Sequence, residues 1–293
     1  MNEKMIKVLE EEVEKKLGNG CAVQFQKIKK NNGVELPAII ITELGMNVSP
    51  VIYIDGMMRR FEQMEMDIHE MAYEIVGIYK SQCDINYFQG IIAGMSKENI
   101  LDKVIYKVVN REKNRSFLAD KPYKAILDLA AVYIIAGNIH NDGTFSIVIT
   151  HELCGKYGIN EGELDAAARQ NTELQGFTIQ SMASILAEMM GIPECEMKYE
   201  TPMVVFTNHV KMYGAAVMLY NSYFKKLSDR LDSDLYILPS SIHEVIAVPT
   251  DKMDQGDLRD MVREININEV EESEVLGENV YIYSREKGTL EIA

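Results

Sequence analysis

The residue types best suited to chemistry in this sequence lie in one short segment, Ser240-Ser241-Ile242-His243-Glu244. A hydroxyl, an imidazole and a carboxylate are the components of a Ser-His-acid triad, in which the imidazole takes the hydroxyl proton and the acid orients the imidazole. A serine-type hydrolase would use Ser240 or Ser241 with His243. However, residues this close together in one turn seldom reach that geometry, and the G-x-S-x-G elbow is absent. We therefore expect no catalytic residues and keep the hydrolase as the alternative.

The same segment is also suited to a hydrogen-bonded turn. It lies between two apolar runs, Tyr236-Ile237-Leu238 and Val245-Ile246-Ala247-Val248, which is typical of a β-hairpin. The two serines follow Pro239, and their hydroxyls can close a turn through hydrogen bonds to the backbone. The histidine and the glutamate would then complete an exposed polar tip. We favour a binding role for this tip over the hydrolase interpretation, and we favour the turn interpretation over both.

A second group of polar side chains precedes a run of small residues. Asn208, Lys211 and Tyr213 stand before Gly214-Ala215-Ala216, where the small side chains allow close approach of the backbone. The three polar side chains are suited to an anion, whereas tight packing is the simpler interpretation of the small ones. No Walker A or G-x-G-x-x-G pattern supports nucleotide binding. Together the two groups form our candidate binding surface: Asn208, Lys211, Tyr213, Ser240, Ser241, His243 and Glu244.

Histidine and cysteine patterns do not predict a metal site. Three of the five histidines precede glutamate, at His69, His151 and His243, but none continues to H-E-x-x-H. That motif is needed to place both imidazoles on one helix face around zinc. Thr150 is suited to N-cap a short helix that contains the second pair. The four cysteines are far apart without a C-x-x-C pair, which favours reduced thiols. We expect no metal and no cofactor.

The elements that would position these residues follow from the hydrophobic pattern. In the C-terminal part, strands are predicted at 203–207, 215–220, 235–238, 245–248, 280–283 and 289–292, with helices at 222–231 and 255–265. In the N-terminal part, helices are predicted at 3–17, 67–79, 110–117, 161–170 and 179–190, with strands at 21–28, 36–42, 104–109, 126–136 and 145–150. Asn31-Asn32-Gly33 predicts a hairpin turn. Ser49-Pro50 matches a capped helix start, although Val51-Ile52-Tyr53-Ile54 would also suit a strand.

This pattern predicts an α+β fold of mostly antiparallel strands with interspersed helices. The acidic stretch 194–201 is the best linker candidate. A boundary there gives two subdomains, residues 1–193 and 202–293, and the alternative is one continuous domain.

Charge and hydrophobicity exclude several classes of protein. The formal net charge is −15, which argues against a general nucleic-acid binder, since such a protein needs a clustered basic surface. Twelve acidic and five basic residues lie between Thr250 and Ala293, where a docking surface for a basic partner is one interpretation. The longest apolar run, Ile126 to Ala136, falls short of the ~20 residues that span a bilayer. The charged N-terminus does not match a secretory signal. We therefore expect a cytoplasmic protein without a membrane segment.

Several motifs together resemble a known family. Ser49-Pro50-Val51-Ile52-Tyr53-Ile54-Asp55, Thr207-Asn208, Tyr213-Gly214-Ala215-Ala216 and the run from Asp234 to Val245, with its L-P-S-S-x-H-E-V signature, occur in the order seen in clostridial domain-of-unknown-function family 5688. The resemblance extends over nearly the whole chain, and a weaker one is to YtpQ-like proteins. It implies a bacterial origin but no activity. Family members commonly carry arginine where this chain has Lys211, so a bidentate clamp on an anion is not expected there.

The sequence thus predicts a non-catalytic binding or regulatory module, with a protein or a small molecule as its partner. The absence of a complete catalytic motif, in a chain of 293 residues, supports this interpretation. The alternative is the serine-type hydrolase described above.

Overall fold

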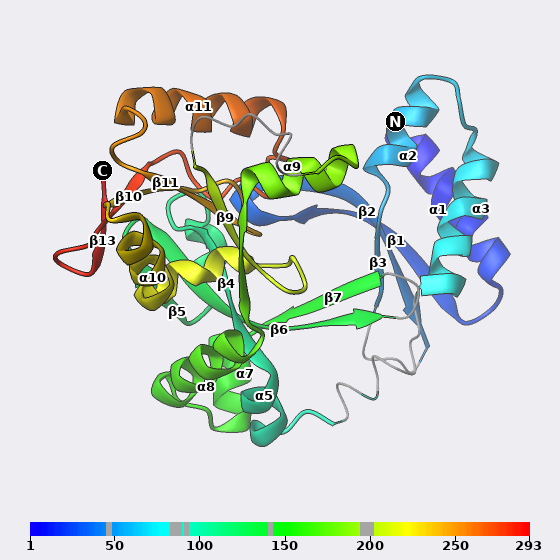
Figure 1. Ribbon diagram of the computed structural model, residues 1–293. Coiled ribbons are helices and arrows are strands. Elements are labelled where there is room, and N and C mark those ends of the chain that lie inside the picture. Colours follow the sequence, from blue (N-terminus) through cyan, green and yellow to red (C-terminus); the bar gives the residue numbers. More distant parts are fainter. Residues whose placement is uncertain (45–48, 83–89, 91–93, 140–142, 194–201) are drawn as a thin grey trace. The chain divides into compact units, whose positions relative to one another are not determined.

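The computed structural model describes residues 1–44, 49–82, 90, 94–139, 143–193 and 202–293. The chain forms two compact units (Figure 1). The smaller unit comprises Met1–Asn99 with Ala136–Ser146, and the larger unit comprises Ile100–Ile135 with Ile147–Ala293. The described strands form three antiparallel sheets interspersed with helices, which confirms the predicted α+β class.

In its described residues, the smaller unit contains a three-stranded sheet, in the order β1-β2-β3, together with helices. Its elements up to residue 82 are α1 (Glu3–Leu17), β1 (Cys21–Lys29), η1 (Asn31–Gly33), β2 (Glu35–Glu43), β3 (Val51–Tyr53), α2 (Asp55–Glu62) and α3 (Ile68–Gln82). The first two strands pair in register from Cys21↔Glu43 to Lys29↔Glu35 around the predicted Asn-Asn-Gly turn. Apolar residues from α1, α3 and the sheet, among them Leu9, Ile39 and Ile75, form one buried core.

The predicted helix start at Ser49-Pro50 is wrong, and the strand alternative is right. Val51 and Ile52 pair with Ile40 and Ile39 of β2, and α2 begins only at Asp55. The β-branched pair fits a pleated sheet better than the first turn of a helix, because Ile52 can be buried there against the core.

The remaining elements follow along the rest of the chain. They are α5 (Lys97–Lys103), β4 (Val104–Asn110), α6 (Arg115–Leu118), β5 (Tyr123–Ile126), β6 (Leu129–Ile139), β7 (Gly143–Val148), α7 (His151–Tyr157), α8 (Glu161–Leu174), β8 (Phe177–Ser181), α9 (Met182–Met190), β9 (Val204–Asn208), η3 (Gly214–Leu219), α10 (Asn221–Leu231), β10 (Leu235–Leu238), β11 (Val245–Pro249), α11 (Gln255–Asn268), β12 (Tyr281–Ser284) and β13 (Thr289–Ile292). One sheet has the order β4-β6-β5, with β7 paired to β6, and the other has the order β13-β12-β10-β11-β9-β8.

The six-stranded sheet is covered on both faces. On one face, Val205, Ile246 and Val248 form an apolar cluster with Leu258 and Val262 of α11, and α9 packs beside it through Met182 and Ile185 (Figure 1). On the other face, the rings of Phe206 and Phe224 of α10 lie 5.2 Å apart in an edge-to-face arrangement. Because β10 and β11 lie in the middle of this sheet, the turn between them is held by a rigid scaffold.

Other predicted features differ from the structure or fall outside it. The predicted helix 179–190 begins only at Met182, because residues 179–181 belong to β8. The segment Ala215–Tyr220, predicted as a strand, lies largely in the 3-10 helix η3. The small side chains of this segment allow a helical turn to pack closely inside the protein, and Gly214 to Met218 are all buried. The predicted linker 194–201 lies outside the described residues. Strands on either side of it, β8 and β9, pair from Phe177↔Asn208 to Ser181↔Val204, so the division into 1–193 and 202–293 does not coincide with the two units.

No helix in the described part of the chain is long and apolar enough to cross a membrane.

Candidate functional site

The segment Ser240–Glu244 connects β10 to β11 as a tight, internally hydrogen-bonded turn. The two strands pair from Leu235↔Pro249 to Leu238↔Ile246, which confirms the predicted hairpin. The Ser241 amide donates to the Glu244 carbonyl at 3.1 Å, and the Ser241 hydroxyl accepts the amide of His243 at 3.0 Å. The Ser240 hydroxyl donates to the Glu244 carboxylate at 3.2 Å. Both serines therefore serve the turn through the bonds expected of turn hydroxyls.

The 208–213 loop, which follows β9, is closed by its first residue. The Asn208 side chain accepts the Met212 amide at 3.1 Å and donates to the Met212 carbonyl at 2.7 Å. Asn208 is only 2% exposed, so its amide positions the loop and does not face solvent. Lys211, in contrast, is exposed, and Tyr213 is partly exposed.

The loop and the turn meet at His243. The Tyr213 amide donates to His243 Nδ1 at 3.2 Å, and the two rings stack with centroids 5.6 Å apart at 21°. The hydroxyl of Thr207 donates to the His243 carbonyl at 2.9 Å. The structure thus brings Tyr213, His243 and Glu244 into one region, with Asn208 and Ser241 beneath them as positioning residues.

The hydrogen bonds of His243 do not match those of a catalytic triad. Nδ1 accepts a backbone N–H, so in the neutral ring the proton is on Nε2, which lies 3.4 Å from Glu274 Oε1. A triad needs an unprotonated ring nitrogen facing the nucleophilic hydroxyl. Here the unprotonated nitrogen faces the Tyr213 amide. The hydroxyls of Ser240 and Ser241 instead bond Glu244 and the His243 amide. The His243 imidazole is therefore not placed as a general base for either serine.

The 208–213 loop contains two strained residues. Lys211 and Tyr213 have φ values of 53° and 60°, in the left-handed region that non-glycine residues rarely adopt. Such conformations cost of order 1–3 kcal/mol each and persist only where the surroundings enforce them, which is common at binding sites. In this backbone conformation the Tyr213 ring contacts two side chains. The ammonium of Lys107 lies 5.2 Å from the ring centroid, and the His243 ring stacks on the Tyr213 ring.

An apolar groove of about 200 Å³ has Ser240 in its lining and lies between α11 and Met182, the first residue of α9. Its lining is aliphatic and rich in methionine: Met182, Met203, Leu238, Pro239, Ile246, Met261, Val262 and Ile265. One polar group interrupts it. Asn266 donates through Nδ2 to the Gly277 carbonyl at 2.9 Å, whereas its Oδ1 is buried and has no hydrogen-bond partner within the described residues. A buried acceptor without a partner costs about 1–3 kcal/mol.

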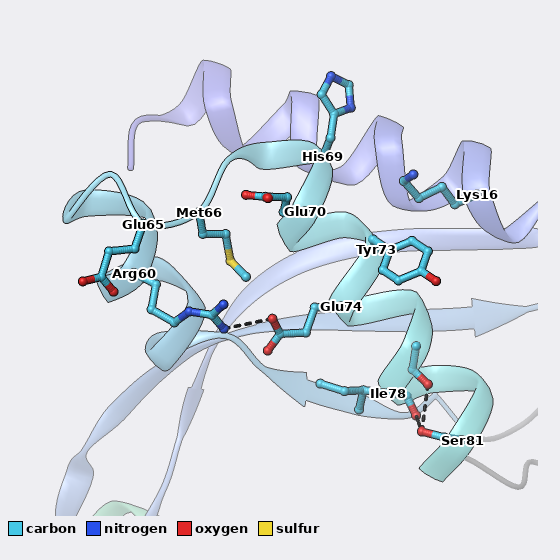
Figure 2. A pocket seen from close by; sticks show the side chains of 11 residues that line it. Lys16, Arg60, Glu65, Met66, His69, Glu70, Tyr73, Glu74, Ile78 and Ser81 are labelled. Atoms are coloured by element: carbon cyan, nitrogen blue, oxygen red, sulfur yellow. Dashed lines mark hydrogen bonds and ion pairs between the residues drawn. The ribbon is translucent and has the colours of Figure 1, made fainter.

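The other two His-Glu pairs of the sequence, at His69 and His151, lie away from this turn. In the smaller unit, His69 is on the exposed side of α3, with Nδ1 3.0 Å from Glu12 Oε2. Beside it is a shallow depression of about 780 Å³ (Figure 2). Charges in this depression pair with each other, as Arg60 does with Glu74 at 2.9 Å. In the larger unit, His151 begins α7, and Thr150 N-caps that helix by accepting the Leu153 amide, as predicted.

No group of three or more His, Cys, Asp or Glu side chains in the described residues is arranged to hold a metal ion.

Sequence reasoning missed a partly buried ionic network in the larger unit. The Asp165 carboxylate of α8 accepts hydrogen bonds from Tyr106 at 2.6 Å and Tyr133 at 3.1 Å, and Lys124 donates to it at 2.7 Å. Burial of Asp165 acts to raise its pKa, but the hydrogen bonds from Lys124 and Tyr106 outweigh that effect and lower the pKa. Because its donors come from β4, β5 and β6, this network holds α8 against the four-stranded sheet.

Comparison with known proteins places the chain in a family. The chain matches no curated protein and no solved structure. A family model described as "Family of unknown function (DUF5688)" matches residues 2–285, which include the hairpin with its L-P-S-S-x-H-E-V signature and the 208–213 loop. This match spans nearly the whole sequence, and the chain therefore belongs to the DUF5688 family of unknown function.

Proposed function

We propose that the larger unit is a non-catalytic binding module. Its binding face, as we define it, consists of Lys211, Tyr213, Ser240, His243 and Glu244. The observation that carries the proposal is the strained 208–213 loop, in which Tyr213 is held at φ 60° with its ring stacked on His243. A contact surface that is held in its bound conformation before binding loses less entropy when it binds, and enforced conformations of this kind occur at such surfaces.

The groove beside Ser240 supports an apolar anchor as part of the ligand. Ser240 belongs both to the binding face and to the groove lining, so the two surfaces are continuous. Methionine side chains adapt their shape to an inserted apolar group, and interface energy concentrates where such a group fills a pocket. Large apolar side chains also lie exposed on the two flanking helices, at Met189, Met190 and Ile267. We infer that the partner is a protein segment that inserts an apolar side chain between α9 and α11.

Charge supports a basic partner segment. Twelve acidic and five basic residues lie between Thr250 and Ala293, a range that includes α11 at one side of the groove. Glu274, 44% exposed, stands next to His243 and adds a carboxylate at the face itself. Complementary charge steers association and selects partners. The expected ligand is therefore a peptide with an apolar anchor flanked by lysine or arginine.

Selection from a randomised displayed peptide library tests this proposal. We expect the selected peptides to share an apolar residue flanked by basic residues. Replacing the groove residue Met261 with glutamine keeps the side-chain length but adds an amide to the apolar wall, and should weaken binding of a selected peptide about tenfold. The matched control is Met64→Gln in the smaller unit, where the side chain is 95% exposed, and binding should not change.

Two results would count against the proposal. One is a library that yields no enriched motif. The other is equal binding of the selected peptide by the wild type and Met261→Gln. Glu274→Gln adds a separate check on charge, because it should weaken binding severalfold and reduce the salt dependence. Glu291→Gln, at a site 51% exposed on β13, is its control.

The hydrolase alternative has its own test. A serine-directed fluorophosphonate probe requires an activated hydroxyl, and neither the Ser240 nor the Ser241 hydroxyl donates to the His243 imidazole. We expect the native protein to remain unlabelled. Labelling that disappears in Ser240→Ala or Ser241→Ala would establish the hydrolase and overturn the non-catalytic proposal.

A further inference from the structure

A basic pocket lies in the larger unit, formed by residues that the proposed binding face does not use. It measures about 300 Å³, and its polar lining consists of Arg111, Arg115, Lys121, Tyr123 and His151, with Leu118 and Ala119 completing the wall. Arg111 directly follows β4, and Arg115 lies in α6. None of the residues that line this pocket is acidic, although the chain carries a formal net charge of −15.

Nearby carboxylates neutralise two of the three formal positive charges in the pocket. Arg115 pairs with Glu112 at 2.6 Å, and Lys121 pairs with Asp120 at 2.6 Å. The Lys121 ammonium also donates to the Phe117 carbonyl at 2.8 Å, and its side chain is only 12% exposed. Lys121 is thus held in a fixed position, whereas the Arg115–Glu112 pair is exposed.

The remaining cation is Arg111, and it has a different environment. The backbone of Arg111 is fixed by a hydrogen bond from its amide to the Asp128 carbonyl at 3.1 Å. The amide of His151 likewise donates to the Asp120 carbonyl at 3.0 Å. Neither the guanidinium of Arg111 nor the imidazole of His151 makes a hydrogen bond or an ion pair within the described residues. On anchored backbone, the pocket therefore presents a fork of guanidinium donors without a hydrogen-bond partner in the described residues, and an imidazole that interacts electrostatically with the Asp120 carboxylate.

We propose that this pocket binds the phosphate group of a small phosphate monoester. A guanidinium matches two phosphate oxygens with paired N–H donors, and such charge-assisted hydrogen bonds are about twice as strong as neutral ones. The imidazole N–H and the Tyr123 hydroxyl supply further donors. The ring of Tyr123, which is 42% exposed, offers an apolar surface to the rest of the molecule. The surrounding negative charge of the chain limits the site to one phosphate group and disfavours a nucleic-acid backbone.

Titration with phenyl phosphate and with inorganic phosphate, at constant ionic strength and with chloride as the blank, tests this inference. Binding is followed by the amide signals of isotope-labelled protein. We expect saturable binding of the wild type, with the shifted signals at Arg111, Tyr123 and His151. Arg111→Gln should weaken phenyl phosphate binding about tenfold or more, because one charge-assisted contact is removed. A lower dissociation constant for phenyl phosphate than for inorganic phosphate indicates an ester, and equal constants indicate free phosphate.

The matched control is Arg263→Gln, which removes the same charge from an exposed position on α11. It should leave the dissociation constant unchanged. Equal weakening by both variants would reduce the effect to net charge and overturn the proposal. So would a wild type without saturable binding, or an Arg111→Gln variant that binds as the wild type does. The result is independent of the peptide-binding face, because none of the residues of that face lines this pocket.

Discussion

At the scale of single residues, the contact between the 208–213 loop and the turn depends on Gly214. A Cβ atom at this position would lie 2.5 Å from the His243 carbonyl oxygen, 2.6 Å from Thr207 Oγ1 and 2.8 Å from the Asn208 amide nitrogen. Two of these three neighbours are backbone atoms, which cannot rotate away. The loop and the turn can approach each other only because this residue has no side chain.

We therefore predict that Gly214→Ala lowers the free energy of unfolding by about 3 kcal/mol or more, as expected for overpacking of a buried site. Chemical denaturation measures this loss. Gly77→Ala is the matched control, because Gly77 lies in α3 with no atom within 4 Å of its added Cβ. There the substitution should stabilise by about 0.5–1 kcal/mol through helix propensity. A Gly214→Ala protein as stable as the wild type would contradict the close packing described here.

The sequence predicted the residue types of this site but not the role of each one. The L-P-S-S-x-H-E-V pattern predicts a hairpin with hydroxyl-closed turns, and the structure confirms that hairpin. It could not show that Asn208 is buried, or that the His243 ring accepts the Tyr213 amide, 30 residues away in sequence. Hydrogen bonds of this kind depend on strand pairing between β9 and β11, which a single sequence does not reveal.

At the scale of secondary-structure elements, Asp165 determines how α8 is attached to the four-stranded sheet. We predict that Asp165→Asn lowers the free energy of unfolding by about 2 kcal/mol, since an amide cannot accept the bonds of Lys124 and both tyrosines equally well. Urea denaturation measures the loss. The control Asp260→Asn, at a side chain 84% exposed, should change stability by less than about 0.5 kcal/mol. Equal effects of the two variants would mean that the network adds no stability.

The elements themselves were largely predictable, whereas this network was not. Periodicity predicted α8, β4 and β6, since their apolar residues repeat at helical or strand spacing. The donors to Asp165 come from three different strands, and no local pattern connects them. One signal was present: a tyrosine in the buried strand β4 needs a partner for its hydroxyl, and the sequence contains no indication of which one. The same limit explains Ala215–Tyr220, where apolar composition alone does not distinguish a strand from a buried 3-10 turn.

At the scale of the whole molecule, buried tyrosines should limit stability at high pH. Burial is the main cause that raises the pKa of Tyr106, Tyr133 and Tyr281. The negative charge of a neighbouring carboxylate raises the pKa further: Asp165 for Tyr106 and Tyr133, and Asp128 for Tyr281. A pKa raised in the folded state means that the folded protein keeps protons that the unfolded chain releases above about pH 10. The resulting stability is fully present below that pH and is lost as the pH rises towards the folded pKa.

We predict that the free energy of unfolding falls above about pH 10, by roughly 1.4 kcal/mol per pH unit for each tyrosine that stays protonated. Denaturation at a series of pH values, with tyrosinate absorbance as a second signal, measures this slope. The buried tyrosines should ionise together with unfolding and not before it. Ionisation of all tyrosines in a protein that remains folded would contradict their burial in the core.

The fold class was predictable because antiparallel strands and amphipathic helices leave strong periodic patterns, but the division into units was not. Residues 136–146 belong to the smaller unit although the chain on both sides of them belongs to the larger one. A linker can be found from composition only where one domain ends and the next begins at a single point in the chain. A unit built from two separate stretches of chain has no such single linker, so composition does not reveal it.

The central claim is that the loop, the turn and the adjoining groove bind a basic, apolar-anchored peptide. The most direct test is titration of isotope-labelled protein with a selected peptide, observed through its backbone amide signals. The claim predicts shifted signals concentrated at Met182, Ser240, His243 and Met261, with signals in the smaller unit unchanged. Shifts concentrated elsewhere on the chain, or no shifts at saturating peptide, would contradict it.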